Sequence, residues 1–151
     1  MSRTSKEPFL PLIRALAEAY QAFEQFSAHQ VRKSGLTPAQ FDVVATLGNT
    51  PGMCCKTLSQ KTLITKGTLT GVLDRLAEKG VISRTPLPED RRSVFVALTP
   101  AGEALFERVF PAQIRYARTA FEGFTPQEIE TQTQKLLQLK GAFIHALEQQ
   151  S

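Results

Sequence analysis

The chain has 151 residues, of which 42% are hydrophobic and 21% charged, so it has the length and composition of one globular domain, alone or with helical extensions. Its 18 Lys and Arg exceed its 14 Asp and Glu, which gives a net charge of +4. No apolar run approaches the ~20 residues of a membrane span, and the N-terminus lacks the apolar stretch of a signal peptide. We therefore expect a cytoplasmic protein with no membrane partner.

The first predicted element is a long amphipathic helix at residues 9–31, because apolar residues recur there at the helical period. Pro8 and Pro11 fit this helix only in or before its first turn. Residues 37–40 (TPAQ) then predict a capping box that opens a short buried helix. After the breaking sequence NTPG, we expect residues 53–55 to form a short strand.

The central stretch, residues 56–99, alternates between helical and strand patterns. The predicted elements are helices at Lys56–Thr62 and Lys66–Lys79, strands at Val81–Pro86 and Ser93–Thr99, and a charged loop at Leu87–Arg92. Two helices joined by a short turn and followed by a two-stranded ribbon are typical of a winged helix-turn-helix. That motif places one helix in a DNA major groove.

Positive charge is concentrated in this stretch. Residues 56–92 contain eight Lys and Arg against four Asp and Glu, so they account for the whole net charge of +4. In the second helix, Leu69, Leu73 and Leu76 predict a buried stripe, which leaves Gly67 and Gly71 on the outer face. Each glycine costs about 1 kcal/mol of helix stability relative to Ala, but together they let the backbone approach another surface closely.

Two further amphipathic helices are predicted at residues 100–118, with a kink at Pro111, and at residues 126–149. Together with the first helix they carry more apolar surface than a small winged domain can cover, so we expect a homodimer. The expected interface residues are the apolar positions Phe9, Leu12, Leu16, Ile129, Leu136, Leu137, Phe143 and Ile144.

The adjacent cysteines Cys54 and Cys55 allow two interpretations. They are either small buried residues or the thiols of a redox switch, which the neighbouring Lys56 favours. With two distant histidines, His29 and His145, the chain lacks metal-ligand spacing, and we expect no metal and no cofactor. No catalytic triad, phosphate-binding glycine loop or paired carboxylates indicate an enzyme.

From residue 66 onward the sequence KGTLTGVLDRLAEKGVISR…PEDRRSVFVALTPAGEAL resembles the MarR family of transcriptional regulators. The specific part is Asp90-Arg91-Arg92, followed by a strand and LTPAG. The resemblance implies a mainly α fold with a small β-ribbon. Residues 37–99 would form the winged helix-turn-helix, and residues 6–34 and 100–150 the helical dimerisation region.

The resemblance also assigns roles to individual residues. The expected DNA contacts are Lys56, Thr65, Lys66, Thr68, Thr70, Arg75, Arg91 and Arg92. Asp90 would brace the wing by holding an arginine, with Arg75 as the expected partner. A pocket for a small aromatic or amphipathic effector would be lined by Phe26, His29, Phe41, Phe106 and Phe110.

The implied function is a homodimeric, sequence-specific regulator of double-stranded DNA. We expect a repressor that reads a pseudo-palindromic operator and is released by a small-molecule effector. Two alternatives stay open at this point: a redox-responsive regulator that uses Cys54 or Cys55, and a winged helix used for protein–protein interaction.

Overall fold

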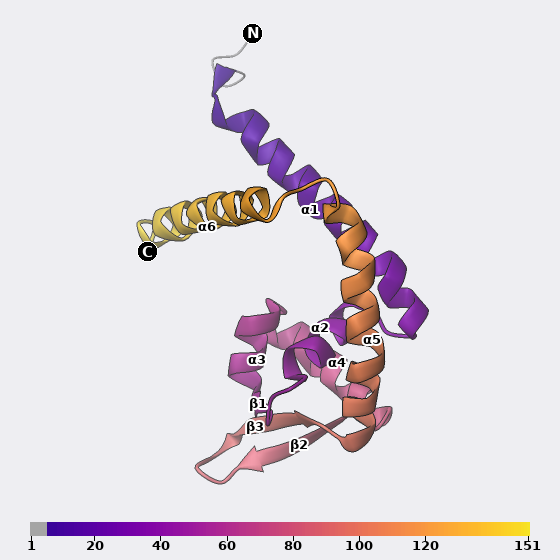
Figure 1. The fold of residues 1–151 in the computed structure, drawn as a ribbon. Helices are drawn as coiled ribbons and strands as arrows, with labels where there is room; N and C mark the ends of the chain where they lie inside the picture. Colours follow the sequence, from indigo (N-terminus) through magenta and orange to yellow (C-terminus); the bar gives the residue numbers. More distant parts are fainter. Residues whose placement is uncertain (1–5) are drawn as a thin grey trace. The chain divides into compact units, whose positions relative to one another are not determined.

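Helices make up most of the chain, and three short strands form its one sheet in a computed structural model that describes residues 6–151, except for the side chain of Arg91 (Figure 1). The elements in chain order are α1 (Phe9–Val31), η2 (Arg32–Ser34), α2 (Pro38–Leu47), β1 (Met53–Cys54), α3 (Cys55–Thr62), α4 (Lys66–Glu78), β2 (Ile82–Leu87), β3 (Asp90–Leu98), α5 (Pro100–Arg118), η3 (Thr119–Phe121) and α6 (Pro126–Glu148). The chain divides into two compact units, Met1–Ile114 and Arg115–Ser151. Within residues 6–151, no helix combines the length and the hydrophobicity needed to span a membrane.

The helix boundaries follow from local sequence chemistry. Helix α1 has the predicted bounds, and Pro8 occupies its N-cap, where a missing N–H costs nothing. Helix α2 begins with the predicted capping box. The Gln40 backbone N–H donates to Thr37 Oγ1 at 3.2 Å, and the Thr37 N–H donates to Gln40 Oε1 at 3.1 Å. These bonds satisfy N–H groups that the helix itself leaves unpaired.

One hydrophobic core organises the first unit. It is built from the apolar faces of α2, α3 and α4, with the end of α1, the first half of α5 and one face of the sheet. Its fully buried side chains include Val31, Val43, Val44, Leu47, Leu58, Leu76 and Val96. The core therefore fixes α3 and α4 relative to the sheet.

The sheet has the antiparallel order β1-β3-β2. The short strand predicted at residues 53–55 is confirmed at two of them, because Met53 pairs with Val96 and Cys54 with Phe95, whereas Cys55 begins α3. Beyond these pairs only β2 and β3 continue, and Figure 1 shows them as a long ribbon below α3 and α4. This ribbon is the wing.

The wing loop is shorter than the sequence predicts. Strand β3 begins at Asp90 rather than at Ser93, and Leu87 pairs with Asp90, so only residues 88 and 89 separate the strands. A register irregularity between Pro86 and Leu87 accommodates the proline, which has no N–H for the ladder. Cross-strand pairing of the backbone thus overrides the low strand propensity of the charged residues.

Thr99 joins the base of the wing to α5. Its hydroxyl donates to the Gly80 carbonyl at 2.6 Å and accepts from the Gly102 N–H at 3.1 Å. Gly102 is buried where α5 comes close to the start of β2. An added Cβ there would lie 2.0 Å from the Val81 carbonyl oxygen. Helix α5 then continues through Pro111.

The second unit contains the last turn of α5, η3 and α6. Thr125 caps α6 as predicted, because its Oγ1 accepts from the Glu128 N–H at 3.1 Å. All 23 residues of α6 are described, and none of them is buried. Its apolar stripe therefore has no cover within the second unit.

Candidate nucleic-acid interface

A three-residue turn at positions 63–65 joins α3 to α4. Leu63 ends α3 with a φ of 62°, in the left-handed region that is costly for a residue with a branched side chain. The Ser59 hydroxyl donates to the Ile64 carbonyl at 2.6 Å and holds the turn closed. The turn and the buried Leu58 set α4 against α3, as the sequence predicts.

Helix α4 has a buried face and an exposed face, and we call the part of the exposed face at Gly67 and Gly71, where no side chain projects, the bare face. Leu69, Leu73 and Leu76 enter the core. Gly67 and Gly71 are exposed, and an added Cβ at either position would meet nothing within 4 Å. Packing inside this chain therefore does not require glycine at these two positions.

The N-terminus of α4 is partly as predicted. Thr65 occupies the N-cap, but its side chain does not accept from a backbone N–H. Its hydroxyl donates instead to Thr68 Oγ1 at 3.2 Å. The first turn therefore keeps N–H groups that can bind a phosphate, beside the exposed side chain of Lys66.

A groove of about 360 Å³, here called the wing groove, lies between the start of α3, α4 and β3. It brings together four predicted DNA contacts: Lys56, Lys66, Thr70 and Arg92. The remaining lining residues are Cys54, Cys55, Leu69, Leu73, Ser93 and Val94. Three cations from three different elements thus surround one concave surface, an arrangement suited to a polyanion.

Arg75 lies elsewhere. It lines a second groove of about 510 Å³ beside the start of α2, together with Arg32, Gly35, Leu36, Thr37, Gln40, Glu78 and Lys79. Of the remaining predicted contacts, Thr65 and Thr68 are exposed at the start of α4. The side chain of Arg91 falls outside the described part of the chain.

Asp90 braces the wing turn locally, but Arg75 is not its partner. The Asp90 carboxylate accepts from the Arg92 backbone N–H at 3.0 Å and from the Ser93 hydroxyl at 3.2 Å. These short-range bonds hold the first residues of β3, next to the wing tip. The predicted pairing was wrong because the tight turn satisfies Asp90 within the wing itself.

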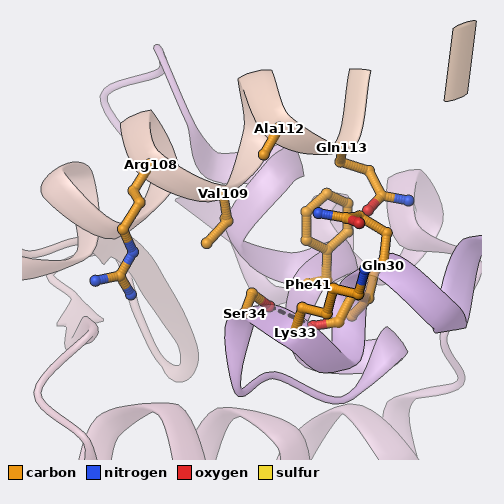
Figure 2. Close-up of a pocket in the computed structure, with 9 residues that line it drawn as sticks. Gln30, Lys33, Ser34, Phe41, Arg108, Val109, Ala112 and Gln113 are labelled. Carbon is orange, nitrogen blue, oxygen red and sulfur yellow. Dashed lines mark hydrogen bonds between the residues drawn. The ribbon is translucent and has the colours of Figure 1, made fainter. Parts of the chain in front are cut away.

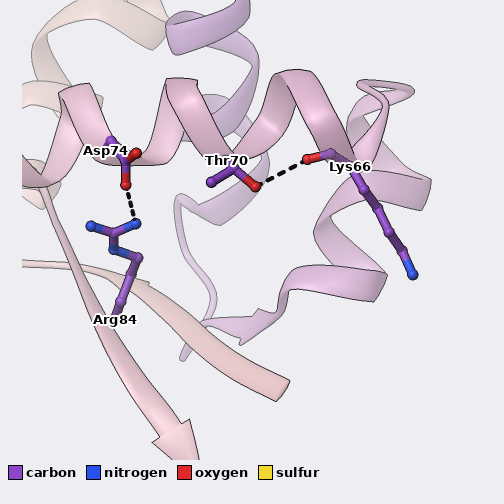
Figure 3. A network of polar contacts seen from close by, with 4 residues as sticks. All are labelled: Lys66, Thr70, Asp74 and Arg84. Carbon is purple, nitrogen blue, oxygen red and sulfur yellow. Dashed lines mark hydrogen bonds and ion pairs between the residues drawn. The ribbon is translucent and has the colours of Figure 1, made fainter. Parts of the chain in front are cut away.

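The ion pair between helix and wing uses two residues that sequence reasoning missed. Arg84 Nη1 of β2 lies 2.5 Å from Asp74 Oδ1 of α4 (Figure 3). Figure 3 also shows that Lys66, Thr70 and Asp74 follow one another along the same side of α4. The sequence does predict the side to which Arg84 points. Arg84 is two residues after the buried Ile82 in β2 and so lies on the same face of the strand.

A separate pocket of about 170 Å³ lies between the end of α1, α2 and α5 (Figure 2). Its lining residues are Gln30, Val31, Lys33, Ser34, Phe41, Arg108, Val109, Ala112 and Gln113. Gln113 is oriented by its amide, which donates to Ser27 Oγ at 3.2 Å. An aromatic ring and two cations therefore line one small pocket.

Of the five residues predicted for an effector pocket, only Phe41 lines this one. Phe106 and Phe110 stack on each other with ring centroids 4.9 Å apart. Phe106 also packs against Gly48, so it belongs to the core. Phe26 is half-buried and His29 exposed, and neither lines the pocket.

The two cysteines differ chemically. The hydrogen bond between Cys54 and the Thr57 hydroxyl, with Sγ 3.2 Å from Oγ1, lowers the pKa of Cys54, which occupies the N-cap of α3. Burial raises the pKa of the Cys55 thiol, and the neighbouring Cys54 raises it further. Both thiols line the wing groove, and Cys54 is the more acidic of the two. Among the described residues, no group of three or more His, Cys, Asp and Glu is placed to hold a metal ion.

The residues predicted to form a dimer interface are uncovered within their own units. In the first unit, Phe9 is 52% and Leu12 51% exposed, while Leu16 is half-buried. In the second unit, Ile129, Leu136, Leu137, Phe143 and Ile144 of α6 are all exposed. These side chains of α1 and α6 therefore form apolar surface that neither unit covers by itself.

Residues 36–94 match the model of the MarR family, and this segment covers the winged helix-turn-helix up to the middle of β3. The homoprotocatechuate degradative operon repressor of Escherichia coli is 30% identical over 123 residues, which cover 81% of this chain and 82% of the relative.

Solved structures agree with this match. The Bordetella bronchiseptica regulator BpsR, solved in a study of its regulation by 6-hydroxynicotinic acid, is 29% identical with a TM-score of 0.77, over 86% of this chain and 98% of that chain. A mutant of MarR from Escherichia coli complexed with operator DNA is 26% identical with a TM-score of 0.77, over 89% and 99% of the two chains. The family consists of transcriptional regulators and not of enzymes. This chain belongs to the MarR family of winged helix-turn-helix transcriptional regulators.

Proposed function

We propose that the protein is a homodimeric repressor that binds a pseudo-palindromic operator in double-stranded DNA and is released by a small aromatic anion. The observation that carries the DNA-binding part is the wing groove. There Lys56, Lys66 and Arg92 converge beside the outer face of α4. The structure of a related regulator complexed with operator DNA supports double-stranded DNA as the partner.

The recognition element is α4, entering the major groove with its N-terminal turn first. Thr65, Lys66 and Thr68 are exposed there, and the bare face at Gly67 and Gly71 lets the helix backbone come close to the bases. Arg92 reaches the neighbouring minor groove from the wing. In this arrangement the cations position the protein, and hydrogen bonds to base edges supply the sequence preference.

Dimerisation is supported by the uncovered apolar faces of α1 and α6. Exposed side chains such as Phe9, Leu12, Leu136 and Phe143 gain about 25 cal/mol for each Å² of apolar surface that a second copy covers. A Leu136→Lys, Phe143→Lys double substitution should convert the dimer to a monomer in sedimentation equilibrium. An unchanged mass would exclude α6 from the interface.

The pocket of Figure 2 is the proposed effector site. Lys33 and Arg108 supply positive charge for a carboxylate or phenolate, and Phe41 supplies a ring surface. Its volume of about 170 Å³ suits a single ring, since a cavity of about 150 Å³ takes up benzene. The relative regulated by 6-hydroxynicotinic acid supports a ligand of this class.

Benzoate is a suitable first probe for this site. Calorimetric titration of benzoate should show binding that Arg108→Gln weakens, and benzoate should release bound DNA from the wild type. An Arg115→Gln variant removes one positive charge from the same helix, outside the pocket, and serves as the control. Equal binding by the Arg108→Gln variant would remove the pocket from the proposal.

A second candidate function, thiol-based regulation, is favoured by the lowered pKa of Cys54 inside the wing groove. Alkylation of Cys54 would place a bulky group among the three cations and weaken DNA binding. N-ethylmaleimide treatment followed by a gel shift tests this, with Cys54→Ser as the control. DNA binding that survives complete alkylation of Cys54 would exclude the thiol mechanism.

The DNA-binding proposal is tested by titrating the protein against the DNA upstream of its own gene over a range of salt concentrations. Each phosphate contact contributes about 0.9 to the slope of log K against log salt, so three or more cations predict a steep dependence. A random duplex of the same length is the control. Equal affinity for both duplexes would exclude sequence-specific recognition, and absence of binding to either duplex would favour a winged helix that binds other proteins.

A further inference from the structure

Arg84 is placed on the inner side of the wing by the strand register. It pairs with Val96, and directly opposed residues of an antiparallel pair point to the same face. Val96 is fully buried in the core, so the Arg84 side chain extends toward α4. There it meets the Asp74 carboxylate at 2.5 Å (Figure 3).

At the level of Arg84 the sheet still has three strands, because Val96 also pairs with Met53 of β1, and the wing loses this support beyond the next residue. The base of the wing is fixed, because the Val81 N–H donates to the Leu76 carbonyl at 3.0 Å and Ile82 is buried. The third strand, β1, ends where Cys54 pairs with Phe95. Beyond that level the wing is an exposed ribbon of two strands, which is marginally stable by itself.

The Asp74–Arg84 pair therefore lies one residue before β1 ends and the wing continues as two strands. It joins two elements, whereas the ion pair Arg14–Glu18 lies within α1. On α4, Asp74 follows Lys66 and Thr70 at intervals of one turn, and those two residues line the wing groove with Arg92. The pair thus links the two sides of the surface proposed to hold DNA.

We propose that Asp74 is a positioning residue for DNA binding, and that its ion pair with Arg84 holds the wing at the distance from α4 that lets both elements engage one site. This inference rests on the proposed DNA-binding function. A carboxylate on a helix that approaches phosphates otherwise opposes binding, because like charges repel. Its pairing with Arg84 offsets that repulsion and orders the wing before DNA arrives.

Asp74→Asn separates this role from simple charge. The substitution makes the protein one unit more positive, so charge alone predicts tighter DNA binding. Loss of the brace predicts the opposite, about two- to fivefold weaker binding, as for loss of an exposed ion pair. The slope of log K against log salt should stay unchanged, because no phosphate contact is lost.

Glu78→Gln is the matched control. Glu78 is exposed on the same helix one turn later, and its carboxylate forms no ion pair with any described residue. This variant gains the same charge and should bind DNA as well as the wild type or slightly better. Asp74→Glu, which keeps the carboxylate, should restore most of the affinity lost in Asp74→Asn.

The exchange variant Asp74→Arg, Arg84→Asp keeps the net charge and rebuilds the pair in reverse. If the exchange variant binds DNA more tightly than either single substitution, the brace is supported; if it does not, the brace is overturned. This test also holds if Asp74→Asn unfolds. DNA binding by Asp74→Asn that equals or exceeds that of the wild type also overturns the proposed brace. A salt slope lowered by about one in Arg84→Gln overturns it as well, because Arg84 would then be a phosphate contact. If the wild-type protein does not prefer its own upstream DNA, the proposed function fails independently of the brace. The brace is then tested by the distance between spin labels on the wing and on α4, compared between the wild type and Asp74→Asn.

Discussion

Substituting Gly71 by Ala should make the protein more stable and a poorer DNA binder. An added Cβ at this position meets nothing within 4 Å, and Gly71 does not have the positive φ that requires glycine. Ala in the middle of an exposed helix then gains about 1 kcal/mol over Gly. For a chain of this length the melting temperature should rise by roughly 2–4 °C.

The loss of DNA binding follows from the place of the new methyl group. Gly67 and Gly71 lie one turn apart on the face of α4 opposite its buried leucines. A methyl group in a close contact that leaves no room for it costs about 1–3 kcal/mol, which corresponds to about a fivefold to 150-fold weaker complex. Stability and affinity should therefore change in opposite directions.

Thermal unfolding at a fixed protein concentration and fluorescence anisotropy with labelled DNA measure the two effects. Thr131→Ala is the control, because Thr131 is exposed on α6 two residues after Ile129, off the apolar stripe proposed to dimerise, and Ala is the better helix former. It should raise stability by a similar amount and leave DNA affinity unchanged. If Gly71→Ala binds DNA as tightly as the wild type, the bare face of α4 does not touch DNA.

Three other predictions test separate parts of the structure. Iodoacetamide should label Cys54 at lower pH than Cys55 in mass spectrometry, because the thiolate of Cys54 forms below the ordinary thiol pKa and that of Cys55 above it; equal rates would contradict this. Arg92→Ala should weaken DNA binding and lower the salt slope by about one, and an unchanged slope would remove the wing contact. Gly102→Ala should cost about 1–3 kcal/mol in urea unfolding, since its Cβ meets a backbone carbonyl, and a neutral effect would refute the close approach.

Local sequence chemistry was enough to predict the helices. The prolines at the start of α1 and the Thr37–Gln40 capping box act over four residues or fewer, so their effect is visible in the sequence. The helix-turn-helix was predicted for the same reason, because α3 and α4 each carry their own apolar stripe. Helix boundaries set by short-range contacts do not depend on the rest of the fold.

The wing and its ion pair depend on contacts between distant residues, and here the sequence was insufficient. The strand register that opposes Arg84 to Val96 also brings β3 forward to Asp90, which shortens the loop. With eight cations between residues 56 and 92, composition alone does not decide which arginine meets which carboxylate. The sequence therefore does not predict that Asp74 pairs with Arg84, and it predicts the wrong partner for Asp90.

Hydroxyl-radical footprinting of the DNA upstream of the gene tests most directly the claim that two copies of α4 read one operator. Two copies related by a twofold axis predict two protected patches with centres about 10–10.5 base pairs apart, or a multiple of that spacing. Each patch should extend into the minor groove contacted by Arg92, and that extension should disappear in Arg92→Ala. A single protected patch, or uniform protection without a preferred site at saturating protein, would contradict the account.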